Sequence, residues 1–230
     1  MPQENSREVF PNVYLVGGPG LTDSSDCLIY AVDGGTEMAL VDCGAGRGTW
    51  RLLENLERWG LSQKPMGAVL LTHCHVDHIG GLEQILKNAK PRVLCHKGDL
   101  EAIETGDPKK TASSWYGIRL PRVKVDLVLE KEEETVVVGG AVLRCIHTPG
   151  HTPGSISILW ERPVGKVLFG QDIHGPFMRE FGSDLNQWAS SMRKLLALEA
   201  DVLCEGHFGI FQPAKEVETF IRSQLSQKGY

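Results

Sequence analysis

The chain has 230 residues, of which 41% are hydrophobic and 23% are charged, and its formal net charge is −5. This length is enough for one α/β domain with its own core, so we expect a single domain over residues 1–230. The acidic balance disfavours a nucleic-acid partner, and the apolar runs are too short to cross a bilayer. The stretch M-P-Q-E-N-S-R-E lacks the apolar core of a secretion signal, and the six cysteines include no C-x-x-C pair. These features predict a cytoplasmic protein.

The first half of the chain alternates short apolar runs with helical patterns. A helix is expected where apolar residues recur at helical spacing before Gly60, namely at Trp50, Leu53, Leu56 and Trp59. A shorter helix is expected at about 98–104. Apolar and β-branched runs predict strands at residues 9–16, 27–32, 38–41, 68–72 and 92–95.

Residues 105–121 have no clean periodicity and carry Trp115 and Tyr116. Long irregular segments in compact domains are often functional, so we interpret this one as an insertion near the mouth of a site. The alternative is a mobile surface excursion.

The second half is predicted to contain more strands and two further helices. An amphipathic helix with Leu185 and Trp188 should begin at a cap formed by Ser183 or Asp184, and a final helix should begin near Pro213. Three of the strands are expected to form a meander. The predicted strands are 123–129, 135–138, 141–146, 155–160, 166–169 and 201–204.

The chemistry of the chain concentrates in residues 69–81, V-L-L-T-H-C-H-V-D-H-I-G-G. A predicted buried strand ends here, and sheet ends of this kind usually carry the chemistry of α/β proteins. Imidazole and carboxylate groups are good ligands for zinc, iron or manganese. Cys74 should alternate to the other side and pack. The clustered residues, which predict a metal-binding loop, are His73, His75, Asp77 and His78.

The pattern H-x-H-x-D-H after a buried strand resembles the metallo-β-lactamase superfamily. That family expects a later His in a Gly-rich loop, an Asp after a further strand and a His near the end. The chain supplies His151 in T-P-G-H-T-P-G, Asp172 in V-L-F-G-Q-D and His207 in V-L-C-E-G-H. The resemblance implies an α/β (α+β) fold, the four-layer αββα sandwich, with all candidate ligands at one edge.

The resemblance also implies two bound divalent metal ions, zinc being the first candidate and iron or manganese the alternatives. Two ions about 3.5–4 Å apart lower the pKa of a shared water and polarise a carbonyl oxygen, so a metal-bridged hydroxide would attack the substrate. Asp77 would also be catalytic by orienting that hydroxide. The implied ligands are His73, His75 and His151 for one ion, Asp77, His78 and His207 for the other, and Asp172 as the bridge.

A carboxylate bridge at Asp172, rather than a Cys, resembles the glyoxalase II (hydroxyacylglutathione hydrolase) branch. The resemblance implies a binuclear hydrolase that cleaves a thioester, ester or lactone in a small-molecule substrate. The enzyme that acts on acylglutathione carries a further helical domain after its last His. Residues 208–230 are enough for one helix, so we expect a thiol other than glutathione.

One alternative of a different reaction class stays open. Persulfide dioxygenases share the fold and much of the motif but use one iron, held by two His and one Asp, with oxygen. His151 and Asp172, with His73 or His75, could form such a site. A binding protein with an inactive site is disfavoured by the complete ligand set, and a nuclease by the acidic charge. The sequence leaves open whether the chain forms a homo-oligomer.

Several residues outside the ligand set are assigned from their positions. Arg179, like Arg119, could meet a carboxylate, and His174 either lines the pocket or faces solvent. Asp42 either supports the metal loop or caps its own turn. His96 and His147 are expected to be structural. The expected substrate-binding residues are Trp115, Tyr116, His174, Phe177, Met178 and Arg179.

Overall fold

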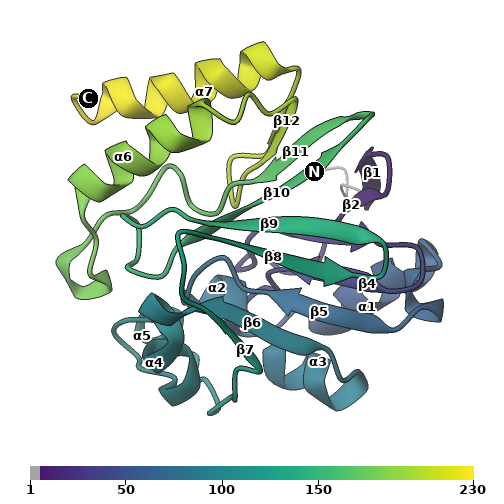
Figure 1. The fold of residues 1–230 in the computed structure, drawn as a ribbon. Helices are drawn as coiled ribbons and strands as arrows, with labels where there is room; N and C mark the ends of the chain where they lie inside the picture. The colour runs from purple at the N-terminus through teal and green to yellow at the C-terminus, as the bar shows by residue number, and fades with distance from the viewer. Residues whose placement is uncertain (1–5) are drawn as a thin grey trace.

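The computed structural model describes residues 6–230 as two β-sheets packed face to face, with helices on the outer faces (Figure 1). The first sheet has seven strands in the order β1 (Arg7–Phe10), β2 (Val13–Gly17), β3 (Ile29–Asp33), β4 (Met38–Val41), β5 (Met66–Leu70), β6 (Arg92–His96) and β7 (Leu127–Leu129). The second has six strands in the order β13 (Ile210–Phe211), β12 (Val202–Cys204), β11 (Gly165–Phe169), β10 (Ile156–Arg162), β9 (Ala141–His147) and β8 (Glu133–Val138).

Helices cover each sheet from outside. The first sheet is covered by α1 (Thr49–Arg58), α3 (Leu82–Asn88) and α4 (Lys97–Thr105), and the second by α6 (Leu185–Leu196) and α7 (Ala214–Gln227). Figure 1 shows α6 and α7 together at the top, on the side of the molecule opposite α3 and α4. Asp184 is the N-cap of α6, because its side chain accepts hydrogen bonds from the amides of Asn186 and Gln187. No helix within residues 6–230 has the length and apolarity needed to span a membrane.

Three apolar clusters hold these layers together. The middle cluster joins the sheets, with Leu15 and Tyr30 from the first sheet and Leu143 and Phe169 from the second. The two outer clusters pack helices against the sheets. Because the first sheet is covered on both faces, all four residues of β4 are buried. The expected four-layer αββα sandwich is therefore confirmed.

The parallel strands decide where the candidate site lies. In the first sheet β4, β5 and β6 run parallel, and in the second sheet β11 and β12 run parallel. Carboxyl ends of parallel strands meet at one edge of a sheet. The two edges are joined directly, because the amide of Ile156 donates a hydrogen bond to the carbonyl of Thr72 at 2.8 Å and that of Leu28 to Gly206 at 2.7 Å.

Two segments differ from the strands expected from sequence. Residues 9–16 form a hairpin of β1 and β2 because Asn12 takes a left-handed turn, with φ of 64°. The expected meander over 123–146 is wrong, since β7 pairs with β6 in the first sheet whereas β8 and β9 belong to the second. Val123 and Val125 are apolar because they pack in the helix-side cluster, without strand pairing.

Helix α1 also differs in the face that it buries. Leu52, Asn55 and Leu56 are buried, whereas Trp50 is 55% exposed. The side-chain amide of Asn55 donates a hydrogen bond from Nδ2 to the carbonyl of Val16 at 2.9 Å, which explains how a polar residue occupies the inner face. The helical spacing of apolar residues therefore placed Trp50 on the buried face of α1, and that prediction is wrong.

Candidate metal centre

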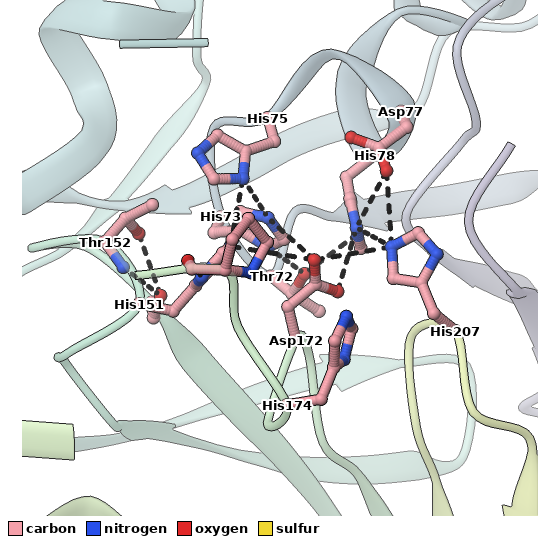
Figure 2. A network of polar contacts seen from close by, with 12 residues as sticks. Thr72, His73, His75, Asp77, His78, His151, Thr152, Asp172, His174 and His207 are labelled. Atoms are coloured by element: carbon pink, nitrogen blue, oxygen red, sulfur yellow. Dashed lines mark hydrogen bonds and ion pairs between the residues drawn. The ribbon is translucent and has the colours of Figure 1, made fainter. Parts of the chain in front are cut away.

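Seven His and Asp side chains converge at the sheet edge, and six of them are at most 5% exposed (Figure 2). Three of the loops that carry these side chains follow β5, β11 and β12, strands that each have a parallel neighbour. His73 and His75 follow β5, Asp77 and His78 lie in the helical turn α2 (Val76–Ile79), His151 lies between β9 and β10, and Asp172 and His207 follow β11 and β12. The sequence predicted a plain loop at α2, and the structure instead forms a helical turn that brings Asp77 and His78 to His207. The His78 ring also lies 4.0 Å from that of His73, so the two ligand groups adjoin each other.

The first group consists of His73, His75, His151 and Asp172. The Nδ1 atom of His75 lies 3.1 Å from Nε2 of His73 and 2.9 Å from Nε2 of His151. The Oδ2 atom of Asp172 lies 3.6 Å from Nε2 of His151 and 3.9 Å from Nε2 of His73. Three ring nitrogens and one carboxylate oxygen thus face a common point, as the ligands of a tetrahedral ion do.

Hydrogen bonds on the outer ring nitrogens fix two of the tautomers. A carbonyl oxygen only accepts, so Nδ1 of His151 must donate to the carbonyl of Pro176, at 2.9 Å. Likewise Nδ1 of His78 donates to Oδ2 of Asp42, at 2.7 Å. The Nε2 atoms of both histidines therefore point into the site, which is the orientation that metal binding needs.

The second group consists of Asp77, His78 and His207, with Asp172 beside it. The Nε2 atom of His207 lies 3.2 Å from Oδ2 of Asp77 and 3.3 Å from Oδ2 of Asp172. The Nε2 atom of His78 lies 3.2 Å from Oδ1 of Asp172. Figure 2 shows the Asp172 carboxylate between the two groups, so one side chain can serve both.

The two groups differ in their electrostatics. Burial lowers the pKa of His75 to about 3 and that of His151 to about 4, so these imidazoles are neutral and keep free lone pairs. Burial also opposes a charge on His207, but the carboxylates of Asp172 and Asp77 outweigh it and raise the pKa of His207 to about 10. The second group therefore attracts a positive charge at this point.

The side chains of both groups could hold divalent metal. The donors are imidazoles and carboxylates, the set that zinc, iron and manganese accept once an arriving ion displaces the protons of the second group. In the described part of the chain, the buried Oδ1 atom of Asp172 has no hydrogen-bond partner, which leaves it free to bind an ion. The identity of the metal stays a prediction.

Asp42 lies directly behind the ligands and holds the strand end from which they start. Its Oδ1 atom accepts a hydrogen bond from the amide of Thr72 at 2.8 Å, and its Oδ2 atom accepts one from the Thr72 hydroxyl at 2.7 Å. With the bond from His78, these contacts place Asp42 in the supporting position rather than the capping one. Cys74 is buried, and its amide and thiol both contact residues outside the ligand groups.

Trp115 and Tyr116 lie beside the centre, at the end of α5 (Ser113–Tyr116). The Trp115 ring lies 5.1 Å from Phe181, whose ring lies 4.3 Å from that of His75. Burial and then the charge of Asp77 raise the pKa of Tyr116 to about 12, so its phenol keeps its proton near the ligands. Trp115 is 54% exposed. Residues 105–121 therefore bring an open aromatic surface to the first ligand group.

The other four expected pocket residues lie in different surroundings. Phe177 packs 5.2 Å from Trp188 and 6.2 Å from His151, so it belongs partly to the outer core. Met178 is 37% exposed, and Arg179 lines a cavity of about 220 Å³ together with Cys74, Asp99 and Phe181. His174 lies closest to the ligands. Its ring is 5.3 Å from that of His207, and its Nδ1 atom donates to Oε1 of Glu205 at 2.9 Å.

Two buried carboxylates beside the ligands escaped the sequence analysis. Glu205 is fully buried, and its Oε2 atom accepts hydrogen bonds from the amides of His207 and Phe208 at 2.6 and 2.7 Å. Asp99 is 2% exposed and contacts two of the ligand loops. Glu205 could have been found from its position two residues before a ligand. Asp99, in H-K-G-D after β6, carries no comparable signal.

A family model described as the Metallo-beta-lactamase superfamily matches residues 23–207. The chain is 32% identical to a probable metallo-hydrolase of Methanocaldococcus jannaschii over 164 residues, covering 70% of this chain and 74% of that protein. It is 31% identical to a hydroxyacylglutathione hydrolase of Ruegeria pomeroyi over 198 residues, covering 84% of this chain but 66% of that protein. Among solved structures, a mutant metallo-β-lactamase from Legionella gormanii superposes with a TM-score of 0.81 at 19% identity, covering 99% of this chain and 95% of that one.

Proposed function

The chain belongs to the metallo-β-lactamase superfamily, and we propose that it is a binuclear metallo-hydrolase that cleaves a thioester, ester or lactone in a small molecule. The metallo-hydrolase level follows from the family and from the His and Asp groups at the sheet edge. The binuclear state, the bond cleaved and the small-molecule partner are our proposals.

The second ligand group is the observation that carries the proposal. A mononuclear iron oxygenase of this fold would need two His and one Asp from the first group only. Here His78, His207 and Asp77 also converge, and the Asp172 carboxylate reaches both groups. An arrangement that gathers two carboxylates against His207 favours a second cation, and a second cation favours hydrolysis.

The bound ions would supply a hydroxide at neutral pH and polarise the carbonyl oxygen of the substrate. The chain's own residues do the remaining work. Asp77 would hold the proton of the attacking water, because its Oδ2 atom faces the space between His78 and His207. Tyr116, protonated beside Asp77, would donate a hydrogen bond to the substrate. Trp115 and Phe181 would cover an apolar part of the substrate.

The ester or thioester class is supported by three observations. The shared position is a carboxylate, Asp172, and the hydroxyacylglutathione hydrolase of Ruegeria pomeroyi aligns over most of this chain. The aromatic surface at Trp115 is 54% exposed, which suits an acyl group of variable size better than a closed pocket would. Glutathione is not part of the proposal.

The test is hydrolysis without oxygen. Protein loaded with zinc or with manganese should hydrolyse members of a panel of acyl thioesters, aryl esters and lactones under nitrogen. The matched control is Trp50→Ala, which alters a 55% exposed Trp on α1 and should leave the rates unchanged. A protein that consumes oxygen with ferrous iron on a persulfide substrate, and hydrolyses nothing on the panel, would establish the dioxygenase alternative instead.

A further inference from the structure

We propose that Asp99 is a positioning residue that holds the loop of His73 and His75 in register with the loop of His151. The inference rests on the proposed metal centre, since it assigns the residue that assembles the first ligand group. Asp99 lies in the first turn of α4, directly after β6, and its hydrogen bonds go to Cys74, Thr152 and Gly154, which are neighbours of the ligands in the chain.

The Asp99 carboxylate joins two loops that come from different sheets. Its Oδ2 atom accepts a hydrogen bond at 2.9 Å from the amide of Cys74, the residue between His73 and His75. The same atom accepts one at 2.7 Å from the hydroxyl of Thr152, the residue after His151. Its Oδ1 atom accepts one at 2.8 Å from the amide of Gly154 in that second loop. One buried side chain therefore fixes the backbone on both sides of the first group.

Close packing makes this connection rigid. A Cβ atom built on Gly154 would lie 2.3 Å from the amide nitrogen of Asp99, and one on Gly98 would lie 2.6 Å from the carbonyl of Pro153. Neither glycine can therefore carry a side chain without moving α4 away from the His151 loop. Since α4 and this loop are in direct contact, a shift of Asp99 moves the ligand loops.

The three contacts require a carboxylate and not merely a polar side chain. Both oxygens of Asp99 face donors, namely two backbone amides and one hydroxyl. An Asn would turn its amide group toward either Cys74 or Gly154, so that a donor faces a donor and one of the two loops loses a backbone hydrogen bond. Asp99→Asn should therefore loosen the first ligand group while almost preserving the volume of the side chain.

The experiment measures zinc affinity at each site separately, by competition with a chromophoric chelator. In a His207→Ala background, which leaves the first group intact, Asp99→Asn should weaken zinc binding on the order of tenfold to a hundredfold. In a His75→Ala background, which leaves the second group intact, the same change should alter affinity by less than about threefold. Thr152→Val should weaken the first site in the same direction, and Thr152→Ser should restore it.

The matched control is Asp26→Asn. Asp26 is also a buried carboxylate, 3% exposed, and it accepts hydrogen bonds from the amide of Ala45 and the hydroxyl of Thr22, outside the ligand loops. The Asp26→Asn variant should lower the melting temperature without a selective loss of zinc affinity at the first ligand group. Equal zinc affinity with and without Asp99→Asn in the His207→Ala background would overturn the role of Asp99 and would leave the proposed metal centre standing. A protein that binds no zinc before mutation would overturn the metal centre and the role of Asp99 with it.

Discussion

The Nε2 atom of His207 lies 3.2 Å from Oδ2 of Asp77, although the two residues follow strands of different sheets. His207 comes after β12 and Asp77 lies in α2 after β5. This contact completes the second ligand group, and it gives the chain a feature that a one-iron site would not need. The first two predictions follow from it.

Metal stoichiometry is the first prediction. The wild-type protein should bind about two divalent ions per chain when metal is in excess, because two ligand groups share one carboxylate. Asp172→Ala should lose both ions, since Asp172 contacts both groups, whereas His207→Ala should mainly lose one. Elemental analysis after dialysis measures the ratio. Saturation at one ion under metal excess would rule out the two-metal mechanism.

The second prediction concerns activity after loss of the second group. His207→Ala should reduce thioester or lactone hydrolysis on the order of a hundredfold or more, because a major source of charge stabilisation in the transition state is removed. Steady-state rates under nitrogen, with zinc or manganese, measure this. Trp50→Ala, on the exposed face of α1, serves as the control. Activity that survives the loss of His207 and depends on ferrous iron and dioxygen would contradict the hydrolase.

The aromatic surface gives the third prediction. Trp115→Ala with Tyr116→Ala should raise KM more than it lowers kcat, because most of the lost contacts bind the substrate rather than the reacting bond. The structure places Trp115 one ring away from His75, through Phe181. Trp50→Ala is the comparison, since Trp50 is equally exposed on α1. A loss confined to kcat would show that these residues act on the chemistry instead.

The fourth prediction concerns acid stability and His96. Burial, followed by the charges of His147 and Lys97, lowers the pKa of His96 to about 4 from 6.5. The unfolded chain therefore binds more protons than the folded chain between these two values, so stability falls as the pH drops from about 6.5 toward about 4. Protonation would also end the hydrogen bond in which Nδ1 of His96 accepts from the amide of Gly98.

His96→Asn keeps an acceptor at this N-cap but does not titrate in that range. The melting temperature of the metal-free variant should therefore fall less than that of the metal-free wild type between about pH 7 and about pH 5. Metal-free samples are needed because acid also releases metal from histidines. An equal fall in both proteins would exclude His96 as a source of the pH dependence.

The seven converging side chains could be predicted from the sequence because each lies in a short motif directly after a predicted strand. The sandwich could be predicted because those motifs resemble a known family. The prediction from sequence was wrong where packing between distant segments determines the structure. The run at Val123 and Val125 reads as a strand, but its apolar residues pack against helices. Trp50 fits a helical pattern, yet α1 buries Asn55 in preference. Asp99 acts through backbone amides of two distant loops, and such partners leave no pattern in a single sequence.

Each ligand group takes side chains from both sheets. The first combines His73 and His75 with His151 and Asp172, and the second combines Asp77 and His78 with Asp172 and His207. An ion bound in either place therefore ties the two halves of the sandwich together, and its binding energy adds to the free energy of unfolding. At free metal one hundred times the dissociation constant, each ion contributes about 2.7 kcal/mol. Metal supply in the cell would then govern how long the folded protein survives, as well as how fast it works.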